Sequence, residues 1–195
     1  YVANKTNAYY VQVKSTYTRK AFLQAILREM AIPCPPTLSE MMEMASTELA
    51  RSGRPLISDE FDHLVASNKV EIVRDLYESS QGTFLIIGEE QLARKLEKWE
   101  RFHGRVLNWV PALPVDLGDA QALAQIYAPT LQIELPILEM LIAQVRGSTR
   151  RVSTNLEMLN ETALENGVKK IDMASFKALL PQDFVTGESP KPRSF

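Results

Sequence analysis

Residues 56–64 read L-I-S-D-E-F-D-H-L, a short apolar run that ends abruptly in acidic residues. Two further apolar runs flank it, A-Y-Y-V-Q-V at residues 8–13 and T-F-L-I-I-G at residues 83–88. The continuous apolar character of residues 83–88 predicts a strand that is buried on both faces. Strands that alternate with helices indicate an α/β fold with a parallel sheet.

Amphipathic helical segments separate these predicted strands. Apolar residues recur at helical spacing over about residues 19–31, and prolines from Pro33 onward end that helix. Thr37 and Glu40 fit a capping box at the start of a second helix, which is expected to end near Gly53. A third helix precedes the last strand, so each pair of strands is joined by helical sequence.

The second half of the chain has a different character. From Asp119 onward only helical periodicity is present, and a last short helix is expected to start at Asp172. The sequence therefore predicts an α/β core over residues 1–114 and a small all-α bundle over residues 115–181. Residues 182–195 contain three turn-forming residues and little apolar surface, which predicts a mostly disordered tail.

Composition excludes several classes of protein. The 195 residues suffice for one core with a small appended unit, and the single cysteine excludes an internal disulfide framework and fits a cytoplasmic location. No apolar run approaches the roughly 18 residues that a membrane-spanning helix needs, so no membrane partner is expected. The net charge of −2 excludes binding of nucleic acid by bulk charge, although a local basic patch is compatible with it.

Asp59 and Glu60 are the first candidates for chemistry. They follow a predicted buried strand, and open α/β sheets bind their ligands at the carboxyl ends of the strands. In nucleotide hydrolases, an aspartate at this position supports magnesium and a glutamate orients the attacking water. The alternative is a loop of solvated acids without a chemical role.

The order of these features resembles the AAA+ ATPases. Four features follow one another along the chain: an acidic strand end, a neighbouring apolar strand, arginines at positions 101 and 105, and a helical unit with Arg150 at a helix start. Within that class, D-E-x-D-H-L at residues 59–64 is most similar to the DNA-transposition ATPases typified by the phage Mu B protein. TnsC-type target selectors and the secretion ATPase ExeA are more distant. The resemblance extends from Tyr1 to about Leu180.

The resemblance implies ATP and magnesium as cofactors and gives roles to several residues. Asp59 corresponds to the Walker B aspartate, which supports magnesium, and Glu60 to the catalytic glutamate. Glu89 stands at the sensor 1 position, where the family usually has a neutral polar residue. Arg105, or alternatively Arg101, corresponds to the arginine finger that reaches a neighbouring subunit's nucleotide. Arg150 corresponds to the sensor 2 arginine of a helical lid, which is the role implied for residues 115–181.

The resemblance also requires a phosphate-binding loop, G-x-x-x-x-G-K-[ST], whose amides cradle phosphates. None of the eight glycines is followed by Lys-Ser or Lys-Thr. Because Tyr1–Asn4 reads as the end of a helix, we expect the first strand, this loop and most of that helix to be missing from the AAA+ core. The 195 residues are accordingly expected neither to bind ATP tightly nor to hydrolyse it, whereas the full-length protein is expected to be an ATPase.

A cluster of cations is a candidate DNA-binding surface. Lys14, Thr16, Arg19 and Lys20 follow the first predicted strand, and such residues suit phosphate contacts that do not read sequence. A solvated loop is the alternative. The resemblance implies a homo-oligomer or filament that assembles with ATP on duplex DNA and delivers that DNA to a transposase. A non-catalytic adaptor and a secretion-type ATPase are the other two functions that the sequence allows.

Overall fold

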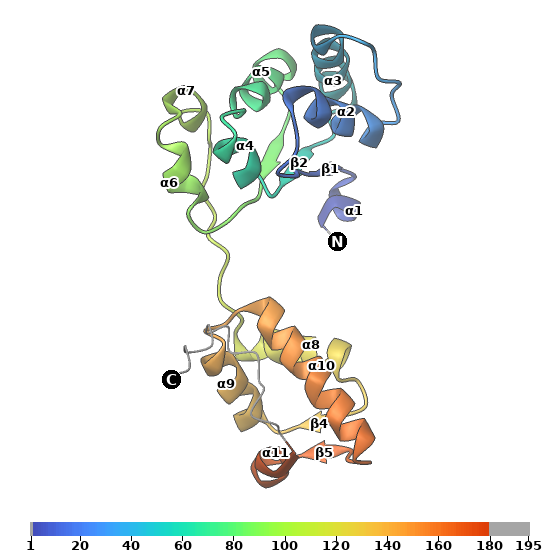
Figure 1. Cartoon of the computed structure of the whole chain (residues 1–195), viewed down its shortest axis with the longest axis vertical. Helices are drawn as coiled ribbons and strands as arrows, with labels where there is room; N and C mark the ends of the chain where they lie inside the picture. The colour runs from blue at the N-terminus through green and yellow to red at the C-terminus, as the bar shows by residue number, and fades with distance from the viewer. Residues whose placement is uncertain (1, 180–195) are drawn as a thin grey trace, which may run out of the picture. The chain divides into compact units, whose positions relative to one another are not determined.

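A computed structural model describes residues 2–179 of the chain. The chain divides after Pro111 into two compact units, which we call the first and the second unit (Figure 1). The sequence placed this boundary after Pro114. None of the helices in the described residues is long and apolar enough to cross a bilayer.

The first unit is an α/β unit with a parallel sheet. Its three strands lie in the order β1-β2-β3, and both neighbouring pairs are parallel, as the sequence predicted. Along the chain the elements are α1 (Val2–Thr6), β1 (Tyr9–Gln12), α2 (Arg19–Glu29), α3 (Leu38–Ser52), β2 (Leu56–Asp59), α4 (Asp62–Ala66), α5 (Glu71–Ser80), β3 (Phe84–Ile86), α6 (Leu92–Leu96) and α7 (Glu100–His103).

Local sequence explains the bounds of the main helices. The side chain of Thr18 accepts a hydrogen bond from the Ala21 amide and so caps α2. Thr37 and Glu40 form the predicted capping box at the start of α3. Gly53 ends that helix with a φ of 64°, a left-handed conformation that glycine adopts without steric penalty. These predicted helix signals are therefore confirmed.

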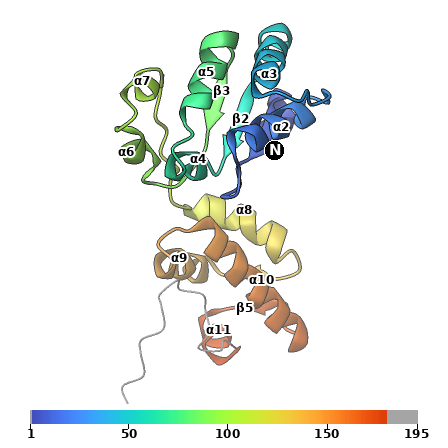
Figure 2. The same ribbon diagram turned by 45° about the horizontal axis from the view of Figure 1, so that its top comes forward.

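The core of the first unit lies on one face of the sheet. Helices α2, α3 and α5 lie side by side (Figure 2) and pack with alternate strand residues such as Tyr9, Val11 and Leu56. On the other face, Leu85 is 44% exposed and Ile87, just after β3, is 41% exposed. The prediction that residues 83–88 are buried on both faces is wrong, because β3 is an edge strand and one of its faces is uncovered in the described part of the chain.

The second unit is largely helical and has a separate core. Its elements are α8 (Leu117–Tyr127), β4 (Gln132–Ile133), α9 (Leu135–Gln144), α10 (Thr149–Glu165), β5 (Lys170–Ile171) and α11 (Met173–Leu179). The prediction of an all-α bundle is corrected by the parallel pairing of β4 with β5. Strands of two residues are too short to show an alternating pattern in sequence. The predicted tail at residues 182–195 lies outside the described residues.

Candidate functional site

The carboxylate of Asp59 is held at the end of the central strand. The hydroxyl of Tyr10, on the neighbouring strand β1, donates to Asp59 Oδ2 over 2.7 Å. The Glu60 amide donates to Asp59 Oδ1 over 2.8 Å. Because each carboxylate oxygen accepts a hydrogen bond, the side chain has a defined orientation at the carboxyl-terminal edge of the sheet. We call Tyr10, Asp59 and Glu60 the acidic edge.

Glu60 adopts a backbone conformation that is unusual for its residue type. Its φ is +54°, in the left-handed region that residues other than glycine rarely occupy. Such conformations cost about 1–3 kcal/mol and gather at functional sites, where the surrounding structure holds them. Its side chain is half-buried. The chain therefore turns sharply after β2 and presents two successive carboxylates at the point where parallel sheets bind ligands.

The Tyr10 hydroxyl is strongly perturbed by its position. The hydrogen bond to Asp59, with smaller contributions from burial and from the charges of Asp59 and Glu60, raises the pKa of Tyr10 to about 12. Ionisation of the phenol would place a negative charge against a carboxylate, so the neutral, donating form is favoured. Sequence reasoning missed Tyr10, because nothing in the run A-Y-Y-V-Q-V shows which tyrosine faces the acids.

This contact predicts a change in the tyrosine titration. In Asp59→Asn the neutral amide no longer opposes ionisation, so the pKa of Tyr10 is expected to fall toward the ordinary value of about 10. Ultraviolet absorbance of phenolate at about pH 11 should therefore show one additional ionised tyrosine in the variant. The difference should disappear when Tyr10→Phe is introduced into both proteins. An identical titration of wild type and Asp59→Asn would show that the two side chains do not interact.

A second carboxylate, Asp62, fixes the loop that follows β3. Asp62 is 8% exposed. Its Oδ2 accepts a hydrogen bond from the Glu89 amide at 2.6 Å, and its Oδ1 accepts one from Lys95 Nζ at 2.7 Å. Burial alone would raise the pKa of Asp62, but these two donors and the lysine charge hold it below its usual value. We call Asp62, Glu89 and Lys95 the Asp62 clamp.

The clamp changes the interpretation of Glu89. Its carboxylate is 67% exposed and lies 2.7 Å from Lys95 Nζ, so a lysine offsets the charge that the sequence placed at the sensor 1 position. Gly88 lies so close to the clamp that an added Cβ would be 2.4 Å from Asp62 Oδ2. The loop is therefore held directly on Asp62. Sequence reasoning missed the roles of Asp62 and Lys95, which are 33 residues apart in the chain.

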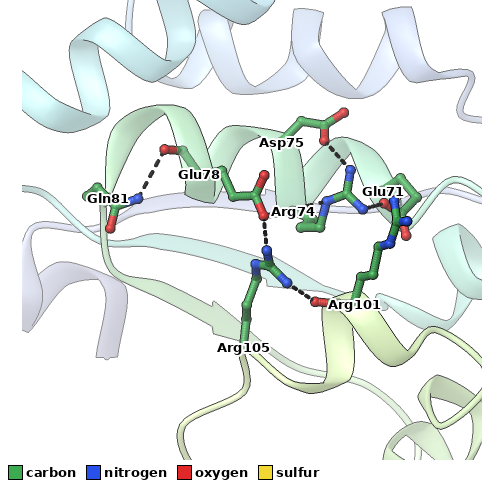
Figure 3. Close-up of polar contacts among 7 residues, drawn as sticks. All are labelled: Glu71, Arg74, Asp75, Glu78, Gln81, Arg101 and Arg105. Atoms are coloured by element: carbon green, nitrogen blue, oxygen red, sulfur yellow. Dashed lines mark hydrogen bonds and ion pairs between the residues drawn. The ribbon is translucent and has the colours of Figure 1, made fainter.

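The arginines after α6 make contacts within the first unit (Figure 3). Arg105 forms an ion pair with Glu78 of α5 and donates to the backbone carbonyl of Arg101. In the same region Arg74 pairs with Glu71 and, over 2.9 Å, with Asp75. Both Arg105 and Glu78 are partly exposed, so this ion pair is accessible to solvent and of the kind that exchanges partners at low energetic cost.

The remaining predicted site residues lie in two places, one after β1 and one in the second unit. Lys14, Thr16 and Arg19 are exposed between β1 and the first turn of α2, and Lys20 Nζ donates to the Pro36 carbonyl over 2.8 Å. Arg150 lies in the first turn of α10 in the second unit and is exposed. The start of a helix at this arginine agrees with the sequence, while the nucleotide contact of Arg150 stays a prediction.

The acidic edge is chemically suited to support magnesium but does not form a complete metal site. Carboxylate oxygens are the ligands that magnesium prefers, and it usually keeps several waters and shares its remaining positions with phosphates. Asp59 provides such an oxygen. No group of three or more metal-binding side chains exists among the described residues. A metal here would therefore depend on a bound nucleotide for further ligands.

Comparison with known protein families adds a direct finding. Residues 2–96 match the family model described as an AAA domain. The matched segment contains the three strands, the acidic edge and the Asp62 clamp, and it ends before Arg101 and Arg105. The match supports an AAA-type ATPase domain with a nucleotide-dependent activity, a class that generally uses ATP and magnesium. No curated protein matches the chain significantly. The transposition type, DNA binding and the roles of single residues remain predictions.

Proposed function

We propose that this protein is an ATP-dependent DNA-binding ATPase that assembles on duplex DNA and delivers it to a transposase. The observation that carries the ATPase assignment is the left-handed Glu60 beside the oriented Asp59 carboxylate, inside the AAA domain match. The DNA and transposase parts rest on the resemblance of D-E-x-D-H-L at residues 59–64 and on the exposed cations after β1.

Each residue of the acidic edge has a distinct role in this proposal. Bound Mg·ATP supplies the phosphoryl group that is transferred to water. Asp59 supports the metal, with Tyr10 and the Glu60 amide holding its carboxylate in one orientation. Glu60 orients the attacking water and accepts its proton. Arg105 acts on the nucleotide of a neighbouring subunit, which requires that it leave its ion pair with Glu78.

The phosphate-binding loop requires an additional segment in the sheet. Among residues 2–179, strand β3 has one unpaired edge, and Leu85 and Ile87 are exposed on one of its faces. Leu107 and Val110, in the irregular segment after α7, are 100% and 82% exposed, which is unusual for large apolar side chains. We propose that a further segment, which includes a strand paired with β3, covers this apolar surface and carries the G-x-x-x-x-G-K-[ST] loop that the 195 residues lack.

A non-catalytic adaptor is the second candidate function. It is favoured by the absence of a phosphate-binding loop from the sequence and by Glu89, whose carboxylate is paired with Lys95. Such a protein would use its surfaces to bind a partner protein and would not respond to ATP. A secretion-type ATPase, the third candidate, would hydrolyse ATP without binding DNA.

The test of the proposed function is the lifetime of assemblies on DNA. In a protein that includes the phosphate-binding loop, Glu60→Gln should retain ATP binding but lose general-base assistance, which is worth about 10²–10⁴-fold in rate. ATP-bound assemblies on a fluorescent duplex should therefore persist far longer than those of wild type. Glu90→Gln, which removes an exposed acid near the Asp62 clamp, is the control. Equal rates of disassembly for Glu60→Gln and wild type would contradict the catalytic assignment, and indifference of both proteins to ATP would favour the adaptor.

A further inference from the structure

A second basic feature adjoins the Asp62 clamp and shares Asp62 and Lys95 with it. Helix α4, helix α6 and the residues just after α6 line an open hollow of about 350 Å³. Its lining is basic with an apolar component and consists of Asp62, Val65, Ala66, Arg94, Lys95 and Lys98. We call this feature the basic hollow. Three cations and one acid face it, so its lining has a surplus of positive charge.

Asp62, the one carboxylate in the lining, already has hydrogen-bond partners. Both oxygens of Asp62 accept hydrogen bonds, one from the Glu89 amide and the other from Lys95. Lys95 is thereby held in place by two carboxylates, each 2.7 Å from its ammonium. Arg94 and Lys98 have no carboxylate partner in the part of the chain that the structure describes. The hollow therefore offers two uncompensated cations beside a third that is fixed in position.

This arrangement suits a phosphate group. Arginine presents a planar set of donors that matches phosphate oxygens, and lysine contributes a point charge. Because Lys95 is already ordered by its carboxylates, little side-chain freedom remains to be lost there when an anion binds. The buried Val65 provides an apolar wall, which weakens solvent screening of charges at the hollow.

We propose that the basic hollow binds a backbone phosphate of duplex DNA. This inference rests on the proposed function and extends it to a second contact surface. Lys14 follows β1, and α6 follows β3 after a short loop, so both basic groups follow carboxyl ends of parallel strands at the same edge of the sheet. They flank the acidic edge in strand order. Two separate phosphate contacts would set the orientation of a duplex without reading its sequence.

The test is the salt dependence of DNA binding, in the presence of ATP, by a protein that includes the phosphate-binding loop. Fluorescence anisotropy of a short labelled duplex would be measured between about 50 and 200 mM salt. Each cation that contacts a phosphate adds about 1 to the slope of log affinity against log salt. The double variant Arg94→Gln/Lys98→Gln is therefore expected to bind more weakly and to lower the slope by about 2. Lys95 is left intact, because it belongs to the Asp62 clamp.

Matched variants separate this inference from the proposed function. Arg28→Gln/Arg51→Gln removes an equal number of positive charges, one from α2 and one from α3. This variant should change the slope of log affinity against log salt only a little. Lys14→Gln/Arg19→Gln tests the surface after β1. If Lys14→Gln/Arg19→Gln weakens binding but Arg94→Gln/Lys98→Gln does not, the inference fails and the DNA-binding function stands. If wild type does not bind the duplex at all, both fail.

Two further outcomes would also overturn the inference. An equal loss of slope in Arg28→Gln/Arg51→Gln would show an effect of total charge rather than a site. Loss of ATP binding in Arg94→Gln/Lys98→Gln, with an unchanged DNA slope, would assign the hollow to a free nucleotide. Denaturation midpoints would also be measured for single variants at Arg94 and Lys98. Unchanged midpoints would show that a lower slope does not come from unfolding.

Discussion

Gly88→Ala is expected to destabilise the first unit by about 1–3 kcal/mol, the cost typical of forcing extra atoms into a packed site. A Cβ at this position would lie 2.4 Å from Asp62 Oδ2 and 2.7 Å from Leu92 Cδ2. The Asp62 carboxylate cannot move away freely, because its two oxygens are bound by the Glu89 amide and by Lys95. Relief of the clash therefore breaks at least one of these contacts.

Chemical denaturation followed by tryptophan fluorescence would measure this effect. The chain has two tryptophans, Trp99 and Trp109, and both lie in the first unit, so the signal reports on that unit. Gly104→Ala is the control, since its nearest neighbour would be the Glu100 carbonyl at 3.3 Å and its φ is −66°. Equal stability changes for the two glycine variants would show that Gly88 is not packed against the clamp.

The clash also predicts that substitutions at Gly88 and Asp62 are not additive. In an Asp62→Ala background the close oxygen is absent, and only the flexible end of Leu92 opposes the new methyl group. Gly88→Ala should therefore cost less in that background than in wild type. Coupling of this kind is typically about 0.5–3 kcal/mol for residues in contact.

The second large effect is expected for Asp62→Asn. The amide keeps the side-chain shape but loses the charge that binds Lys95, so stability at neutral pH should fall by about 1.5–3 kcal/mol, as for hydrogen bonds to charged groups. Denaturation midpoints across pH, with Glu97→Gln as the exposed control, would measure it. The same loss in Glu97→Gln would mean that the effect reflects net charge and not the clamp.

The pH dependence of this difference follows from the lowered pKa of Asp62. A carboxyl whose pKa is lower in the folded than in the unfolded state stabilises the fold when it is ionised. That contribution is complete above the unfolded value of about 3.9 and is lost as pH falls through the folded value. The advantage of wild type over Asp62→Asn should therefore be constant from neutral pH down to about pH 5 and should shrink below about pH 4. An advantage that persists in strong acid would contradict the ionised clamp.

Features encoded by neighbouring residues were predictable from the sequence. The capping box at Thr37 and Glu40 and the end of α3 at Gly53 depend on side chains within one helical turn of the feature that they determine. The alternation of helices and strands was sufficient to predict a parallel sheet. The acids after β2 were likewise visible, because they interrupt an apolar run.

Features that depend on long-range contacts were not predictable. Tyr10 reaches Asp59 from the neighbouring strand, 49 residues away in the sequence. Lys95 reaches Asp62 from α6, 33 residues further along the chain. The left-handed backbone of Glu60 is imposed by tertiary structure and has no signal in its residue type. In each case the partner is selected by the register of the sheet and the packing of helices on it.

Strand β3 shows that an apolar pattern can correctly predict a strand and still mispredict how deeply that strand is buried. Residues 83–88 have the composition of a strand covered on both faces, yet Leu85 is 44% exposed on the open face of the sheet. Apolar composition indicates that a segment is suited to be covered by other apolar groups. It does not indicate whether the same stretch of chain supplies those groups. The exposed face of β3 supports the further strand that we propose beside it.

The rate of ATP hydrolysis tests the central claim, a nucleotide site built on Asp59 and Glu60, most directly. It would be measured at saturating Mg·ATP for wild type and Glu60→Gln, each in a protein that includes the phosphate-binding loop, with ATP binding measured alongside. We predict that hydrolysis falls by about 10²–10⁴-fold while ATP binding is retained. Hydrolysis at the wild-type rate in Glu60→Gln would contradict the account.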